Sequence, residues 1–229
     1  MTEREHQRMP YAVQVEFRTP SSFLITYSVN LSRGGLFLET DQQVPEGSPI
    51  ELQLAIPNVG QIDVAGMVMW RRPPDSPDGP PGLGIEFQDV APQLGAVIDR
   101  LVSSFHGMQI LLLSGDRQDR TTLARSIKSI ITTAEILQAA DASVAGTLMT
   151  NEIDLAVVDV DFDVDGALST IRAAKQVVPP VPTVALVSTA KLREHAKAAG
   201  ADELVANPPP FAELQVVLIR ALAKPVSVR

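Results

Sequence analysis

The chain has 229 residues, of which 45% are hydrophobic and 20% charged, with a formal net charge of −8 and no cysteine. This length predicts one large domain or two small ones. The lack of cysteine excludes disulfides and thiolate chemistry, and the acidic balance argues against nucleic-acid binding through a general basic surface. We see no signal peptide and no apolar run long enough to span a bilayer, so we expect a cytoplasmic protein without a membrane partner.

Short runs that alternate between apolar and polar residues, separated by turn residues, fill the chain from Tyr11 to Phe87. Such runs are typical of antiparallel strands. The six runs are residues 11–17, 23–29, 35–40, 49–56, 61–70 and 82–87. A helical pattern of apolar residues follows over Pro92–Phe105. We therefore predict a first domain, residues 1–106, that is a six-stranded antiparallel β-barrel with one helix.

Beyond Gly107, continuous apolar runs alternate with helical patterns. The five runs are residues 109–113, 134–139, 154–160, 183–188 and 203–206. Continuous apolar runs are expected for parallel strands that are buried on both faces. The pattern predicts a second domain, residues 107–229, with a doubly wound, flavodoxin-like α/β fold.

Two polar segments of the first domain raise a question of function. One is REHQR, with Arg4 and Arg8, and the other is NLSRGG, which follows the run at residues 23–29. If residues 11–17 and 23–29 form a hairpin, its register places Arg8 beside the second segment. We therefore expect both segments to meet at one end of the sheet.

These two motifs, RxxxR followed by [DN]xSxxG, resemble those of the PilZ domain family, and GMVMWRR and GLGIEF fit the later strands of that family. The resemblance covers about residues 1–105 and implies binding of cyclic di-GMP. Its ligand-binding residues here would be Arg4, Arg8, Asn30, Ser32 and Gly35, with Arg33, Gly34 and Trp70 as further candidates. Trp70 is equally well explained as a core aromatic.

The chemistry of the motif residues suits a cyclic purine dinucleotide. A guanidinium group can stack on a guanine face, donate two hydrogen bonds to its O6 and N7 atoms, or pair with a phosphate. Asn30 and Ser32 would add hydrogen bonds from the turn, and the glycines would let backbone N–H groups approach the ligand.

The second half of the chain, residues 108–229, resembles the receiver domains of two-component signalling. The resemblance places Asp159 at the position of the phospho-acceptor. Ser114 and Gly115 stand where the acidic pair of the magnesium site belongs, which leaves Asp116 as a weak metal candidate. Asn207 lies where the family carries a lysine. We therefore expect a degenerate receiver; in the alternative, an active one, Asp116 and Asp161 replace the usual metal ligands.

The stretch DFDVDG, residues 161–166, matches the start of a calcium-binding EF-hand loop. The twelfth position of that loop should be a glutamate, but here it is Arg172. The sequence therefore favours an acidic loop after a strand, and we expect no metal site.

Together these features predict a non-enzymatic effector that binds cyclic di-GMP and relays the signal to an unidentified protein partner. A homodimer through the receiver-like domain is a further expectation, and no cofactor is expected unless an active receiver needs Mg²⁺. One alternative is a response regulator phosphorylated at Asp159, with the barrel as its output. The other is a scaffold in which neither site is active.

Overall fold

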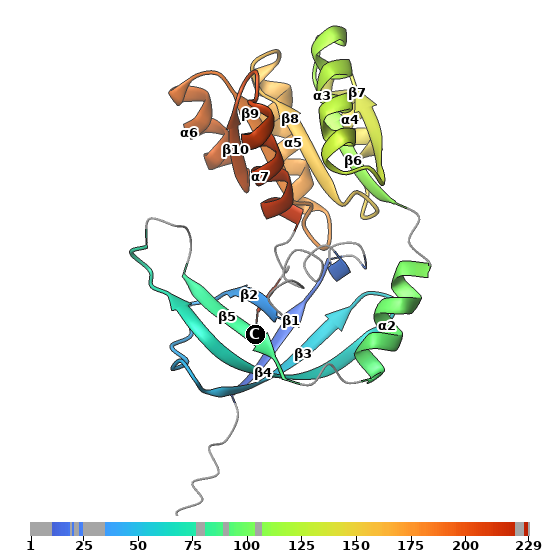
Figure 1. Ribbon diagram of the computed structural model, residues 1–229. Coiled ribbons are helices and arrows are strands. Elements are labelled where there is room, and N and C mark those ends of the chain that lie inside the picture. Colours follow the sequence, from blue (N-terminus) through green and yellow to red (C-terminus); the bar gives the residue numbers. More distant parts are fainter. Residues whose placement is uncertain are drawn as a thin grey trace, which may run out of the picture. The chain divides into compact units, whose positions relative to one another are not determined.

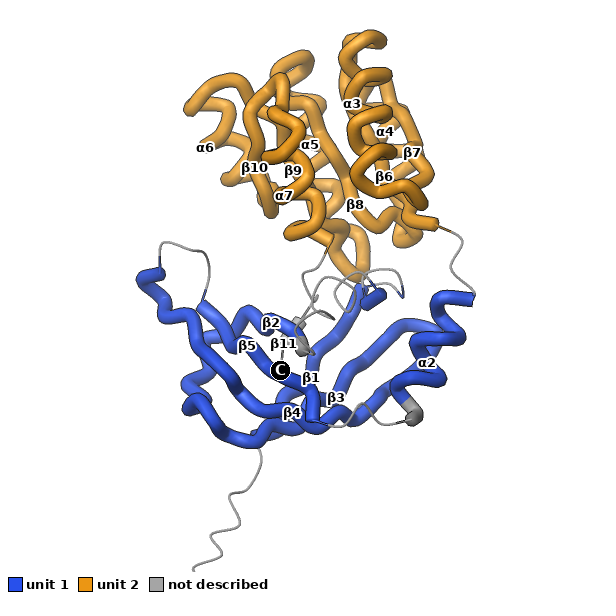
Figure 2. The backbone as a smooth tube through the Cα atoms, in the orientation of Figure 1, with its two compact units in different colours: residues 1–104, 225–229 blue, residues 105–224 orange. Residues whose placement is uncertain are grey.

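The computed structural model of the protein describes residues 11–18, 20, 23–24, 35–76, 81–88, 92–103, 107–222 and 227–228. The chain divides into two units, which Figures 1 and 2 show: unit 1 comprises residues 1–104 and 225–229, and unit 2 comprises residues 105–224. No helix in the described ranges is both long and apolar enough to cross a membrane. The domain boundaries at residues 1–106 and 107–229 stay a prediction.

Unit 1 is built on a curled six-stranded sheet with the order β11-β1-β3-β4-β5-β2 (Figure 1). Its elements are β1 (Tyr11–Glu16), β2 (Gly35–Glu39), β3 (Pro49–Ile56), β4 (Gly60–Arg72), β5 (Gly82–Phe87), α2 (Pro92–Ser103) and β11 (Ser227–Val228). Strand β1 runs parallel to β3, and all other neighbouring pairs are antiparallel. The predicted class of a barrel-like β unit with a helix is confirmed, with one parallel pair in place of a fully antiparallel sheet.

The predicted strand over residues 23–29 is wrong where the structure describes it, because Phe23 and Leu24 are helical. The remaining residues of that run lie outside the described ranges. In sequence terms Thr19-Pro20 is a typical helix start, a signal that our prediction did not use. Phe23 still packs edge to face against Phe17, with ring centroids 5.1 Å apart. Strand β1 pairs with β3 and β11 instead of forming the expected hairpin.

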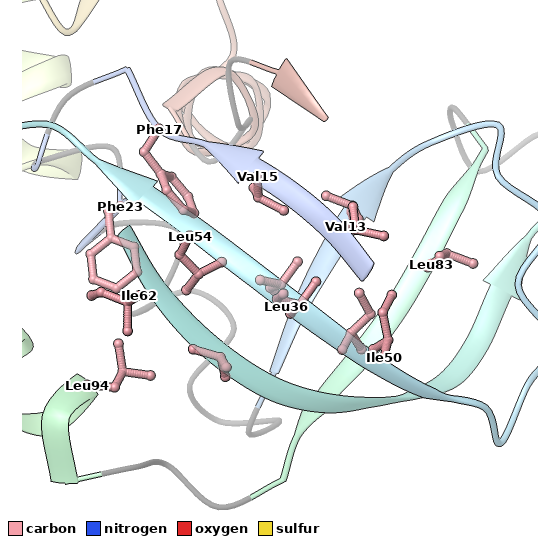
Figure 3. Close-up of a cluster of buried hydrophobic side chains, with 14 of the residues drawn as sticks. Val13, Val15, Phe17, Phe23, Leu36, Ile50, Leu54, Ile62, Leu83 and Leu94 are labelled. Carbon is pink, nitrogen blue, oxygen red and sulfur yellow. The ribbon is translucent and has the colours of Figure 1, made fainter. Parts of the chain in front are cut away.

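The inner face of the sheet buries one apolar cluster, which Figure 3 shows. Alternate residues of the strands supply it, such as Val13 and Val15 of β1 and Leu36 of β2. Leu94 of α2 also belongs to the cluster and is fully buried. Strands β1 and β2 stand far apart in the sheet order, so their shared core means that the sheet curls on itself.

Unit 2 contains a five-stranded parallel sheet with the order β10-β9-β8-β6-β7. Its strands are β6 (Met108–Leu113), β7 (Ala134–Ala139), β8 (Leu155–Asp159), β9 (Thr183–Val187) and β10 (Glu203–Ala206). Its helices are α3 (Arg117–Ile130), α4 (Ala142–Leu148), α5 (Val164–Gln176), α6 (Ala190–Ala199) and α7 (Phe211–Leu222). Read from β7 to β10, the order is the flavodoxin-like 2-1-3-4-5 arrangement, as predicted.

The helices of unit 2 cover both faces of its sheet. Helix α3 contacts α7, whereas α5 contacts both α4 and α6. Strands β8 and β9, enclosed between these layers, are buried along their whole length. Since all five strands run parallel, the residues that follow them gather at one edge of the sheet.

A core substitution tests the inner face of unit 1. Leu54 of β3 is fully buried, so we expect Leu54→Ala to lower the free energy of unfolding of unit 1 by about 2–5 kcal/mol. The fluorescence of Trp70, the sole tryptophan of the chain, reports the unfolding of this unit in urea. Gln53→Ala is the control, because Gln53 faces outward, where its side chain donates an exposed hydrogen bond to Asp63 at 3.3 Å. Equal losses for the two variants would contradict the assigned face.

Candidate functional site

The outer face of the sheet in unit 1 carries three rows of cross-strand neighbours over β2, β5 and β4. The rows are Gly35–Glu86–Met67, Phe37–Gly84–Trp70 and Glu39–Gly82–Arg72. The neighbours of Phe37 along β2, Leu36 and Leu38, are buried in the core. Phe37 therefore lies on the opposite, outer face.

A β-bulge turns Trp70 toward this outer face. The register of β4 against β5 shifts between Val68, which is buried, and Trp70. Because of the extra residue, Trp70 pairs with Gly84 and joins the row of Phe37. Trp70 is 36% exposed, so its interpretation as a core aromatic is wrong.

Phe37, Trp70 and Arg72 form a stack on the outer face. The rings of Phe37 and Trp70 are nearly parallel, at 12°, with centroids 5.2 Å apart. The guanidinium carbon of Arg72 lies 4.4 Å from the centroid of Phe37 and 5.6 Å from that of Trp70. Two glycines provide the space. A Cβ atom added to Gly84 would lie 2.1 Å from Trp70 Nε1, and one added to Gly82 would lie 2.5 Å from Phe37 Cζ.

Strands β1 and β2 begin at almost the same level of the sheet. Through β3, Tyr11 is level with Gly66 of β4. Through β5, Gly35 is level with Met67, the next residue of β4. The first residues of β1 and β2 therefore lie within one residue level of each other, although the two strands run in opposite directions.

Most of the motif residues lie outside the described ranges, namely Arg4, Arg8, Asn30, Ser32, Arg33 and Gly34. Of the residues predicted to bind the nucleotide, the structure places Gly35 at the start of β2 and Trp70 near the end of β4. Both belong to the outer face, in neighbouring rows.

Unit 2 has a separate polar site around Asp159, which ends β8 and is only 7% exposed. Ser114 Oγ donates a hydrogen bond to Asp159 Oδ2 at 2.9 Å. The other oxygen, Oδ1, accepts from the backbone N–H of Asp161 at 3.1 Å and from Asn207 Nδ2 at 2.9 Å. Both carboxylate oxygens are thus engaged by neutral donors.

Asp161 belongs to the same network. Its Oδ1 accepts from the backbone N–H and the hydroxyl of Ser188, at 3.1 and 2.9 Å. Its Oδ2 accepts from Asn207 Nδ2 at 2.7 Å, so one amide group bridges the two carboxylates. The network ties together the carboxyl ends of β6, β8, β9 and β10.

Residues of the loop between β6 and α3 cap a helix and pack against an aromatic ring. Asp116 caps α3 by accepting from the N–H groups of Gln118 and Asp119. The ring of Phe162 lies against Gly115, where an added Cβ atom would come within 1.9 Å of it. The part of the chain that the structure describes contains no group of three His, Cys, Asp or Glu residues that could hold a metal ion.

The acidic stretch after β8 also has a local structural role. Asp163 caps α5, accepting from the N–H of Gly166 at 3.1 Å. Arg172 is part of the same helix. Helix capping therefore gives Asp163 a structural role, and the Asp159 network gives one to Asp161.

The buried position of Asp159 changes its acidity. Burial raises the pKa of this carboxyl above its ordinary value, and the nearby charges of Asp161 and Asp119 act in the same direction. The hydrogen bonds from Ser114 and from the Asp161 backbone lower the pKa and offset part of the rise.

Comparison with known families assigns unit 1. Residues 2–104 match the family model described as PilZ domain. This part of the chain is a PilZ domain. The matched range contains both motif segments and the outer face described above, and it confirms the family resemblance. A PilZ domain implies cyclic di-GMP binding and is typically a signalling domain without enzymatic activity.

Solved receiver domains are similar to the chain over about half of its length. One from a DNA-binding response regulator of Colwellia psychrerythraea is 19% identical, with 51% of this chain and 99% of that chain covered and a TM-score of 0.46. The receiver domain of a Pseudomonas aeruginosa sensor histidine kinase is 24% identical, with 52% and 99% covered and a TM-score of 0.46. Unit 2 owes its assignment as a receiver-like fold to its strand order. No curated protein matches the chain.

Phe37 and Arg72, the partners of Trp70 in the PilZ domain, were not predicted from the sequence. The signal was present in part, because Phe37 alternates with apolar residues in GLFLE and two glycines flank Leu83 in GLGIEF. The bulge in β4, which brings the three side chains onto one face, has no clear mark in the sequence.

The raised pKa of Asp159 predicts a dependence of stability on pH. The folded unit binds this proton more tightly than the unfolded chain, so the carboxyl destabilises unit 2 increasingly as the pH rises above its unfolded pKa of about 4. Asp159→Asn removes this penalty and keeps an acceptor for Asn207. We expect unit 2 to melt a few degrees higher, on the order of 2–5 °C, near pH 7, with a difference that shrinks toward pH 4.

The measurement is thermal unfolding followed by circular dichroism at several pH values. Glu152→Gln is the control, because it removes one exposed carboxylate from the same unit. A lower melting temperature for Asp159→Asn than for the wild type near pH 7 would contradict the assigned direction of the pKa.

Proposed function

We propose that this protein is a non-enzymatic effector that binds cyclic di-GMP through its PilZ domain and passes the signal to a protein partner. The observation that carries the proposal is the family match over residues 2–104, because this range contains both motifs. The proposed binding residues are Arg4, Arg8, Asn30, Ser32 and Gly35, with Arg33, Gly34 and Trp70 as further contacts.

The register of the sheet supports a common site for the two motifs. The segments before Tyr11 and Gly35 join the sheet at adjacent levels. Strands β1 and β2 also line one core, so the curl of the sheet brings them toward each other. Arg8 is three residues before Tyr11, a span of about 10 Å at most. Because β1 and β2 run in opposite directions, the proposal requires one segment to fold back toward the other, in place of the hairpin that the sequence suggested.

Each motif residue has a role that fits the ligand. The arginines would pair with the two phosphates and with the guanine edges, where bidentate contacts give both strength and selectivity. Asn30 and Ser32 would donate to or accept from the base and the phosphate. Gly35 has no side chain to block the approach of the ligand to the start of β2.

The receiver-like domain serves in this proposal for dimerisation or partner docking, with residues 1–106 and 107–229 as the two domains. Neutral donors engage both oxygens of Asp159, and Asn207 supplies no positive charge. Phosphoryl transfer to a carboxylate needs a metal ion and a cation to balance the added charge. For the alternative, a response regulator phosphorylated at Asp159, the described residues contain no group of three His, Cys, Asp or Glu residues for a metal ion, and Asn207 lies where the family carries a lysine.

Loss of one motif arginine tests the nucleotide site. We expect Arg8→Ala to weaken cyclic di-GMP binding at least about 100-fold, because it removes hydrogen bonds from a charged group to the ligand. Isothermal titration calorimetry measures the affinity, and thermal unfolding checks the fold. Arg100→Ala, in the last turn of α2, is the control and should bind as the wild type does. Wild-type affinity in Arg8→Ala would count against the site.

A small phospho-donor tests the second domain. We expect no stable adduct on Asp159 after incubation with acetyl phosphate and Mg²⁺, as measured by intact mass, since the described residues offer no group of ligands for the metal ion and Asn207 brings no positive charge. Asp159→Asn serves as the blank for modification elsewhere. A stoichiometric adduct that is lost in Asp159→Asn would favour the response regulator. The absence of both an adduct and cyclic di-GMP binding would favour a scaffold.

A further inference from the structure

We propose that Phe37, Trp70 and Arg72 form a preformed stacking platform for a purine base of the bound nucleotide. The inference rests on the proposed function and deepens it, because it adds Phe37 and Arg72 to the site. In this inference, the outer face of β2, β5 and β4 recognises a base of the ligand.

The platform is built into the backbone of the sheet. The bulge after Val68 is what moves Trp70 from the inner to the outer alternation of β4. Gly84 lies between Phe37 and Trp70 in their row, and any side chain at this position would collide with the indole. The two rings can therefore approach each other across three strands, to 5.2 Å between centroids.

The stack presents an aromatic ring and a guanidinium group that can stack on a nucleobase. Trp70 is 36% exposed, and the guanidinium plane of Arg72 is held beside both rings. Aromatic rings and guanidinium planes both stack on nucleobases. Arg72 adds a positive charge for a dianionic ligand. Because the ring contacts already hold this side chain, little conformational entropy remains to be lost on binding.

The platform lies next to the proposed motif site. Gly35 ends the second motif, and Phe37 is the next residue of β2 on the same face, about 7 Å further along the strand. A ligand held by the residues before Gly35 could therefore lay one of its bases over Trp70 and Arg72. A dinucleotide can span the roughly 7 Å between Gly35 and Phe37, because its bases lie next to its phosphates.

A purely structural role gives a different expectation. Aromatic side chains on a sheet can simply cover glycines in the neighbouring strand. In that case the ligand would leave the surroundings of Trp70 unchanged, and replacing Arg72 would affect stability alone. Ligand binding and the fluorescence of Trp70 distinguish the two roles.

The experiment titrates the full-length wild type with cyclic di-GMP and follows Trp70, the only tryptophan present. We expect a saturable fluorescence change whose midpoint agrees with calorimetry. Arg72→Met should weaken binding about ten-fold. Arg71→Met is the matched control and should stay within about two-fold, because Arg71 pairs with the buried Leu83 and lies on the opposite face.

The outcomes separate this inference from the proposed function. If the wild type binds the nucleotide with no change in Trp70 fluorescence, or if Arg72→Met is folded and binds like Arg71→Met, the platform is refuted and the function stands. If calorimetry detects no binding to the wild type, both fall. Should Arg72→Met fail to fold, the wild-type fluorescence titration decides alone.

Discussion

The cross-strand register from β1 through β3, β4 and β5 to β2 is the constraint on which the first unit depends. Burial of alternate residues on the inner face enforces it, because a slip of one residue would exchange the core and solvent faces of a strand. The same register brings the starts of β1 and β2 to adjacent levels. The proposed common site of the two motifs depends on this register, because no hairpin links β1 to β2.

The residues that are buried on the inner face determine which residues lie on the outer face. Each residue that β2, β4 and β5 bury in the core places its neighbour on the outside, so Leu36 and Leu38 determine the side of Phe37. Only the bulge breaks this alternation, and it does so where an aromatic residue follows. Glycines at two of the three rows of β5 keep the face open, whereas ordinary strand residues would separate the rings.

The sequence predicted some elements better than others for physical reasons. The strands of unit 2 were predictable, since the central strands β6, β8 and β9 are almost fully buried and are continuous apolar runs, and the edge strands β7 and β10 keep short apolar runs. In unit 1, FLITYSV looked like a strand, but Phe23 and Leu24 are helical, and Phe23 still packs against Phe17 in the core. Strand β11 was not predictable, because two residues carry no period and gain their place only by pairing with β1. The direction of Trp70 depended on a bulge, which the alternation of β4 alone could not indicate.

In unit 2 the main electrostatic constraint is the repulsion between two carboxylates at the edge of the receiver-like fold. Parallel strands bring Asp159 and Asp161 together at one edge of the sheet, and two carboxylates this close repel each other unless something lies between them. In an active receiver a metal ion and a lysine provide that compensation. Here the amide of Asn207 bridges the pair, and hydroxyls of Ser114 and Ser188 complete it. Neutral donors stabilise the existing charges, but they offer nothing to the further negative charge of a phosphoryl group. In the proposed function, the receiver-like fold is kept without phosphoryl transfer, and the PilZ domain receives the signal.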